Sequence, residues 1–286
     1  MVESRLTRYL LRGAVVLTLG FIYVPLVVIG LYAFNESVTQ GWPIENFSTK
    51  WFSVAWENED VRDALKMSVL AGLGATAIAV VLGTLASLAV SRYRFFGREV
   101  ISFAVILPIA LPGIITGLAL LATIQDVLQP LPLGITFGLV TIIIGHATFC
   151  IVVIYNNALA RLRRTAGSLD EASADLGADS WQTFRYVTLP QMRTALLAGA
   201  LLAFALSFDE VVVTVFTAGA DQTLPIWIFA SLFRPAEQPI VNVVALFVII
   251  VSIIPIYLAQ RLAGGAGLTS DRPAKTDVAA SVETAP

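Results

Sequence analysis

The chain has little of what soluble proteins and metal centres are built from. Charged residues make up 13% of its 286 residues, about half of the roughly 25% that is usual in soluble domains. One cysteine and one histidine exclude a disulfide framework and give no Cys/His metal cluster. The net charge of −2 offers no footprint for nucleic acid. No phosphate-binding glycine loop, nucleophile elbow or zinc motif occurs, so we expect a chain that is no enzyme and binds no cofactor or metal.

Apolar residues are what the chain has in abundance. They make up 57% of the sequence, and the mean hydropathy is +0.81. A membrane span needs about 20 mostly apolar residues, and the first apolar run is too long for the apolar part of a cleaved signal peptide. We therefore expect an all-α membrane protein with six transmembrane helices. They cover residues 11–34, 64–91, 100–125, 134–157, 193–217 and 239–261.

The basic residues predict the orientation of these spans. Lys and Arg concentrate in the cytoplasmic segments of membrane proteins. Placing both termini in the cytoplasm leaves only four of the 18 basic residues outside, namely Lys50, Arg62, Lys66 and Arg234. We therefore expect a cytoplasmic N-terminus over residues 1–10 and a six-span domain over 11–262. Residues 263–286, rich in Gly, Ala, Thr, Ser and Pro, are expected to form a disordered cytoplasmic tail.

Two spans carry unusual residues. In the third span, Pro108, Pro112 and Gly113 predict a kink, because proline removes a backbone donor. The kink serves either packing or a hinge beside a gate. His146, the only histidine, lies in the fourth span and is interpreted as a hydrogen-bonding residue between helices, with a pore-lining role as the alternative.

A polar segment, residues 158–192, separates the fourth and fifth spans. Ser168, with Glu171 three residues later, fits a capping box, and Gly177 fits a C-terminal stop. A second short helix is expected from Ser180 to Tyr186, capped by Asp179 or Ser180. Such a pair is either an amphipathic hairpin on the membrane surface or a docking element for a partner. Its apolar side chains without lipid cover would be Leu176, Trp181, Phe184, Tyr186 and Val187.

The spacing within this segment resembles the EAA loop of type I ABC importer permeases. The matching residues are Glu171-Ala172, Gly177, Val187 and Leu189-Pro190, with mild departures at Ser173 and Val187. Residues 5–262 are also similar to the second permease subunit of spermidine/putrescine-type importers. That similarity lies in Leu107-Pro108, Leu111–Ile114, Gly145–Cys150, Ala203–Glu210 and Asn242–Ala245.

The resemblance implies the type I ABC importer permease fold in a bacterial inner membrane. The implied partners are a homologous permease in a heterodimer, two ATP-binding subunits that hold ATP and Mg, and an extracytoplasmic binding protein. The implied cargo is putrescine or spermidine, with 4-aminobutyrate or another small amine as the alternative. A stand-alone channel or secondary transporter is the rival class. The ATPase-coupling residues would be Glu171, Ala172, Ser173, Asp175, Leu176, Gly177, Trp181, Phe184, Leu189 and Pro190.

Two acids inside the fifth predicted span are the candidates for a cation path. A charge at the centre of a span costs about 2.5–3.5 kcal/mol on insertion scales, so Asp209 and Glu210 need a reason to be there. Neighbours on a helix point about 100° apart, so only one is expected to face a shared cavity. The alternative is a structural acid at an interface. Phe208 and Asp126 complete the candidate path, although Asp126 also fits a solvated helix end.

Overall fold

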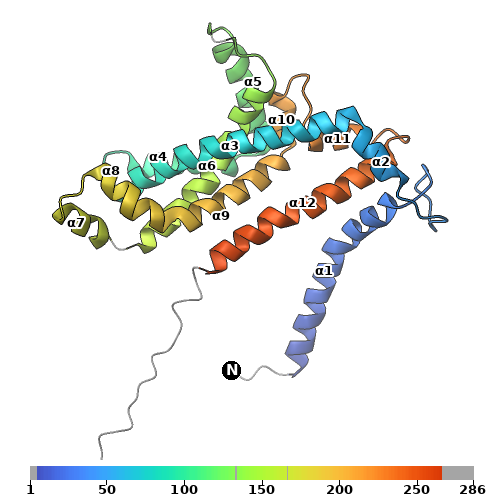
Figure 1. Ribbon diagram of the computed structural model, residues 1–286, viewed down its shortest axis with the longest axis horizontal. Helices are drawn as coiled ribbons and strands as arrows, with labels where there is room; N and C mark the ends of the chain where they lie inside the picture. The colour runs from blue at the N-terminus through green and yellow to red at the C-terminus, as the bar shows by residue number, and fades with distance from the viewer. Residues whose placement is uncertain (1–4, 133, 166, 266–286) are drawn as a thin grey trace, which may run out of the picture.

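The computed structural model describes residues 5–132, 134–165 and 167–265, and regular structure in this part is helical apart from one isolated β-bridge between Asn35 and Phe47 (Figure 1). The all-α prediction is confirmed. The expected tail lies outside the described residues from 266 on.

The helices are α1 (Arg5–Ala33), α2 (Lys50–Glu57), α3 (Glu59–Arg92), α4 (Arg98–Ala110), α5 (Gly113–Thr123), the π-helical turn η1 (Ile124–Leu128), α6 (Leu139–Arg164), α7 (Ser168–Asp175), α8 (Ser180–Thr183), the π-helical turn η2 (Phe184–Thr188), α9 (Leu189–Phe208), α10 (Val212–Thr217), α11 (Leu224–Ser231) and α12 (Gln238–Gly265).

Five helical segments of the described chain are long and apolar enough to cross a membrane. They are Leu6–Ala33, Glu59–Arg92, Leu139–Arg164, Ser180–Phe208 and Gln238–Arg261. A sixth span arises only if the pair Arg98–Ala110 and Gly113–Leu128, bent by 107°, counts as one. The chain is therefore a multi-pass membrane protein, as expected.

The third span is broken rather than kinked. Leu111 is extended, with φ −82° and ψ 146°, as is usual for a residue that precedes proline. Pro112 then leads into α5. Pro108 lies inside α4 without ending it, so of the two prolines only Pro112 marks the break.

The prediction of one continuous fifth span over residues 193–217 is wrong at both ends. The helix begins earlier, because Ser180–Phe208 runs through η2 without interruption, and Pro190 sits in the first turn of α9, where its missing N–H is tolerated. The helix also ends earlier, at Phe208. Residues 209–211 lie outside any helix, and the chain resumes as the short helix α10.

Close packing of α3, α6 and α9 forms the core of the molecule. Small residues such as Ala75, Ala79 and Ala203 are fully buried there. A Cβ on Gly83 of α3 would lie 2.9 Å from the carbonyl oxygen of Ile151 in α6, so glycine is what permits the helices to approach this closely.

Two regions lie away from this core. Among residues 6–33 of α1, only Ala33 is buried, and in Figure 1 α1 diverges from α12 toward its N-terminal end. The α7–α8 hairpin lies at one end of the molecule, and α2 with the preceding loop lies at the other. The exposed apolar surface of α1 requires lipid or another subunit to cover it.

Candidate functional site

The turn between α7 and α8 is built on a left-handed glycine. Gly177 has φ +84°, its N–H donates to the carbonyl of Ala174 (2.9 Å), and the N–H of Ala178 donates to that of Ser173 (3.0 Å). These two bonds are the Schellman arrangement that ends helices. The predicted stop at Gly177 is confirmed.

The two helix starts differ from each other. Asp179 caps α8: its carboxylate accepts from the N–H of Gln182 (2.8 Å), and the Gln182 side chain accepts from the N–H of Asp179 (2.9 Å). The prediction that Ser168 caps α7 is wrong, because Ser168 is the first helical residue and no side chain caps this end. The preceding Gly167 already has helical dihedral angles.

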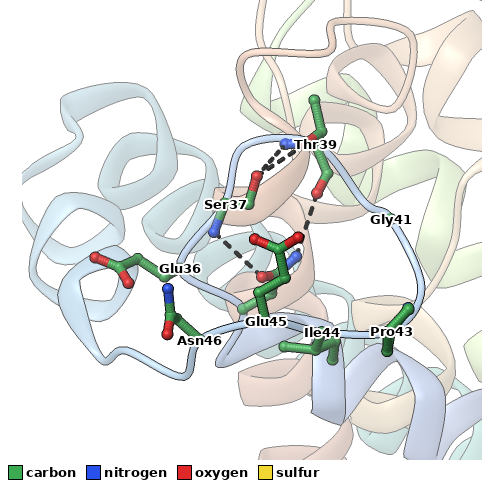
Figure 2. A pocket seen from close by; sticks show the side chains of 9 residues that line it. Glu36, Ser37, Thr39, Gly41, Pro43, Ile44, Glu45 and Asn46 are labelled. Carbon is green, nitrogen blue, oxygen red and sulfur yellow. Dashed lines mark hydrogen bonds between the residues drawn. The ribbon is translucent and has the colours of Figure 1, made fainter.

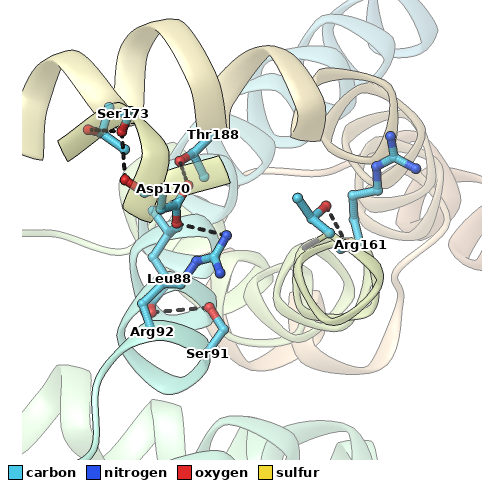
Figure 3. A network of polar contacts seen from close by, with 9 residues as sticks. Leu88, Ser91, Arg92, Arg161, Asp170, Ser173 and Thr188 are labelled. Carbon is cyan, nitrogen blue, oxygen red and sulfur yellow. Dashed lines mark hydrogen bonds and ion pairs between the residues drawn. The ribbon is translucent and has the colours of Figure 1, made fainter. Parts of the chain in front are cut away.

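Polar contacts fix the hairpin to the rest of the molecule (Figure 3). The hydroxyls of Ser173 and Thr183 lie 2.8 Å apart and join α7 to α8. Asp170 forms an ion pair with Arg92 at the end of α3 (2.9 Å) and accepts from the Thr188 hydroxyl (3.3 Å). A coupling role for Arg92 or Asp170 is not predicted from the sequence, although Asp170 directly precedes the Glu-Ala motif.

The hairpin exposes large apolar side chains. Leu176, Trp181 and Tyr186 are 89%, 66% and 71% exposed, as predicted. Phe184 and Val187 are partly buried, and the Phe184 ring packs against Trp181 at 5.7 Å between centroids. Exposed aromatic and aliphatic side chains on an otherwise polar element are typical of a protein interface. The remaining motif residues are exposed at Glu171, Ala172, Asp175, Gly177 and Pro190 and partly buried at Ser173 and Leu189.

The two acids of the fifth span lie in a helix break, not in a helix interior. Glu210 accepts the N–H of Val213 with its carboxylate (2.9 Å), and its carbonyl accepts the Thr214 hydroxyl (2.7 Å). Asp209 is exposed, and within the described chain its carboxylate has no hydrogen bond or ion pair. Glu210 thus acts as a helix cap, whereas the Asp209 carboxylate has no partner among the described residues.

The breaks of the third and fifth spans are neighbours. A Cβ on Gly113 would lie 3.4 Å from Val212, and one on Gly117 would clash with Phe216. Helices α5 and α10 therefore run side by side in the same direction, each beginning just after its break. Non-helical backbone at membrane depth is tolerated where it is buried in protein or lines a cavity, and in transporters paired breaks form substrate sites.

His146 holds the two sides of the fifth-span break together. Its Nδ1 lies 2.7 Å from the Ser207 hydroxyl and its Nε2 lies 2.8 Å from the Thr214 hydroxyl. Because Thr214 gives its proton to the Glu210 carbonyl, Nε2 donates and Nδ1 accepts from Ser207. The buried ring confirms the interpretation of His146 as a hydrogen-bonding residue between helices.

The other two members of the predicted path lie elsewhere. Phe208 is 6% exposed, stacks with Phe204 (5.9 Å between centroids) and belongs to a core cluster with Trp227. Its side chain is therefore part of the core. Asp126 is exposed in η1, and no hydrogen bond or ion pair among the described residues connects it to Asp209 or Glu210.

A polar pocket occupies the loop after α1, at the end of the molecule opposite the hairpin. It has a volume of about 300 Å³ and is lined by residues between Asn35 and Asn46. Figure 2 shows the hydrogen-bonded turn beside it, in which the hydroxyls of Ser37 and Thr39 lie 2.8 Å apart. Glu36 and Glu45 belong to its lining, so this end of the molecule carries negative charge.

Comparisons with known proteins define the class. Residues 65–265 match the family described as "Binding-protein-dependent transport system inner membrane component", and the chain belongs to this family. Among its relatives, the "Putrescine transport system permease protein PotI" of Escherichia coli (strain K12) is 33% identical over 86% of this chain and 90% of its own. The "Spermidine/putrescine transport system permease protein PotC" of Haemophilus influenzae (strain ATCC 51907 / DSM 11121 / KW20 / Rd) is 30% identical over 90% of this chain and 98% of its own.

Solved structures confirm the expected fold, that of type I ABC importer permeases. A chain of a bacterial ABC transporter involved in the import of alginate has a TM-score of 0.64 and 18% identity. The match covers 93% of the present chain and 99% of the other. A chain of the inward-facing MetNI methionine ABC transporter has a TM-score of 0.56 and 18% identity, with 72% and 93% coverage.

Proposed function

We propose that the chain is a permease subunit of an ATP-driven ABC importer for polyamines such as putrescine and spermidine, in a bacterial inner membrane. The names of the relatives support this cargo over 4-aminobutyrate. The chain pairs with a homologous permease, two ATP-binding subunits bind and hydrolyse ATP with Mg, and a binding protein delivers substrate from outside. The hairpin end of the molecule faces the cytoplasm.

One observation carries the coupling mechanism. The segment Ser180–Phe208 is one uninterrupted helical run through α8, η2 and α9, so the hairpin and the break at Asp209 lie at its two ends. Its longest part, α9, has 20 residues and is about 30 Å long at 1.5 Å per residue. When the ATP-binding subunits close, they move the exposed surface of α7 and α8. The uninterrupted helical run transmits that movement to the break.

The adjacent breaks supply the chemistry for a cation. An ammonium group needs oxygen acceptors in place of water, and Asp209 lies in the break of the fifth span, which is followed by the helix that packs against α5. Glu210 stabilises the start of α10 and so keeps Asp209 in place. Asp209 is therefore the acid that we assign to the path.

Glu171 provides the test of the coupling role. It is exposed on α7 and has no hydrogen bond or ion pair within the described chain, so its loss affects only what docks there. In the assembled complex, Glu171→Ala should lower the stimulation of ATPase activity by the loaded binding protein about 5-fold or more, within the usual range of coupling between sites.

The matched control is Glu99→Ala, which removes an exposed acid from the first turn of α4 outside the hairpin. It should leave the stimulation unchanged. Equal stimulation in wild type and Glu171→Ala would contradict the role of the hairpin.

A further inference from the structure

We propose that Arg92 and Asp170 form a positioning pair that couples the hairpin to α3. The chain itself joins the hairpin to α6 on one side and to α9 on the other. The pair adds a third, non-covalent connection to a helix that is distant in sequence. This inference rests on the proposed coupling function of the hairpin and identifies a way in which its movement reaches the spans.

The two charges of the pair are close together and largely shielded from solvent. The Arg92 Nη2 lies 2.9 Å from the Asp170 Oδ2, and the two side chains are only 23% and 25% exposed. The other carboxylate oxygen accepts the Thr188 hydroxyl. A Cβ on Gly167 would lie 3.6 Å from the Arg92 Nη1, so the guanidinium fits closely beneath the start of α7 (Figure 3).

Helix α7 is held in place by polar contacts, namely the ion pair with Arg92 and the hydrogen bonds to Thr183 and Thr188. None of its eight residues is buried, so no apolar core fixes its position. The Arg92 Nε and Nη2 are both buried and form no hydrogen bond among the described residues. The ion pair with Asp170 is therefore a contact of charges, and Asp170 is the counter-charge of a half-shielded guanidinium. Removing one member of such a pair leaves the other uncompensated.

Helix α3 connects the pair to the packed core of the molecule. This helix has 34 residues, and buried residues recur along it from Val61 to Val90. It packs against both α6 and α9, with close approaches at Gly72 and Gly83. A hairpin tied to Arg92 therefore acts on α3 directly, whereas an untied hairpin reaches α3 only through its packing against α6 and α9.

The experiment uses the complete complex with its binding protein, reconstituted in liposomes. The variants are Arg92→Gln, Asp170→Asn and the charge swap Arg92→Asp with Asp170→Arg, and the readout is putrescine imported per ATP hydrolysed. Arg94→Gln is the matched control, because Arg94 is exposed two residues further on and has no ion pair in the described chain.

We expect each single variant to lower putrescine imported per ATP by about 5-fold or more, while ATP hydrolysis continues. The charge swap should recover at least about half of the wild-type ratio, and Arg94→Gln should match wild type. Single variants with the wild-type ratio would overturn the proposal. So would single variants that lose assembled complex without rescue by the swap, because the pair would then be structural only.

The outcome also separates this inference from the proposed function. If Glu171→Ala uncouples the complex and the pair variants do not, the hairpin couples without Arg92 and Asp170. If none of these variants changes coupling, the proposed function of the hairpin itself is wrong.

Discussion

At the residue scale, the local backbone gives the neighbouring acids Asp209 and Glu210 different surroundings. Glu210 is occupied by the N–H of Val213 (2.9 Å), while the exposed Asp209 has no hydrogen bond or ion pair in the described chain. Composition alone makes the two residues equivalent. The helix break makes them different, because one carboxylate caps α10 and the other has no partner among the described residues.

This division predicts unequal effects of neutralisation. Asp209→Asn should lower putrescine uptake by the assembled complex about 10-fold or more, since a lost charge interaction of about 1.4 kcal/mol corresponds to that factor. Glu210→Gln should retain uptake within about 2-fold, because the amide oxygen can still accept from Val213. Glu210→Ala should instead destabilise the complex by about 0.5–2 kcal/mol. Uptake that survives Asp209→Asn, or that is lost in Glu210→Gln, would reverse the assignment.

At the element scale, the packing of α3 on α6 determines the rigidity of the bundle formed by α3, α6 and α9. The Cβ position of Gly83 lies 2.9 Å from the Ile151 carbonyl oxygen, and a backbone atom cannot give way as a flexible side chain does. Glycine at this crossing is therefore a packing requirement. It is not a requirement of backbone conformation, because Gly83 lies within a regular helix.

Enlarging this residue should loosen the bundle. Gly83→Leu is expected to destabilise the purified complex by about 1–3 kcal/mol or more through overpacking, seen as a lower midpoint of thermal unfolding in detergent. Gly20→Leu is the matched control, since the Cβ position of Gly20 on α1 has no atom within 4 Å. Equal midpoints for the two variants would show that the helices approach less closely than described.

The sequence predicts these elements unevenly, for physical reasons. Two local signals predict the hairpin correctly, the glycine stop at Gly177 and the cap at Asp179 or Ser180. The equally local capping box at Ser168 is wrong, because the preceding Gly167 already has helical dihedral angles. The break after Phe208 was missed because it depends on tertiary partners, above all His146, which comes from another helix. The pair of Arg92 and Asp170 was missed for the same reason.

At the scale of the whole molecule, the chain is a part of a larger assembly. The side chains of α1 are almost all exposed, the hairpin exposes Leu176, Trp181 and Tyr186, and the two lie in different regions of the molecule (Figure 1). Surfaces of this size and character require lipid or protein cover. The proposed second permease and the ATP-binding subunits provide such cover.

The central claim is that this chain imports polyamines only as part of an ATP-driven complex. The most direct test places it in liposomes, alone and together with its partner permease, ATP-binding subunits and binding protein. Uptake of putrescine, spermidine and 4-aminobutyrate is then measured with and without ATP. We predict that the full complex takes up putrescine or spermidine only when ATP is present, and that the isolated chain takes up neither. Uptake by the isolated chain, or by the complex without ATP, would contradict it.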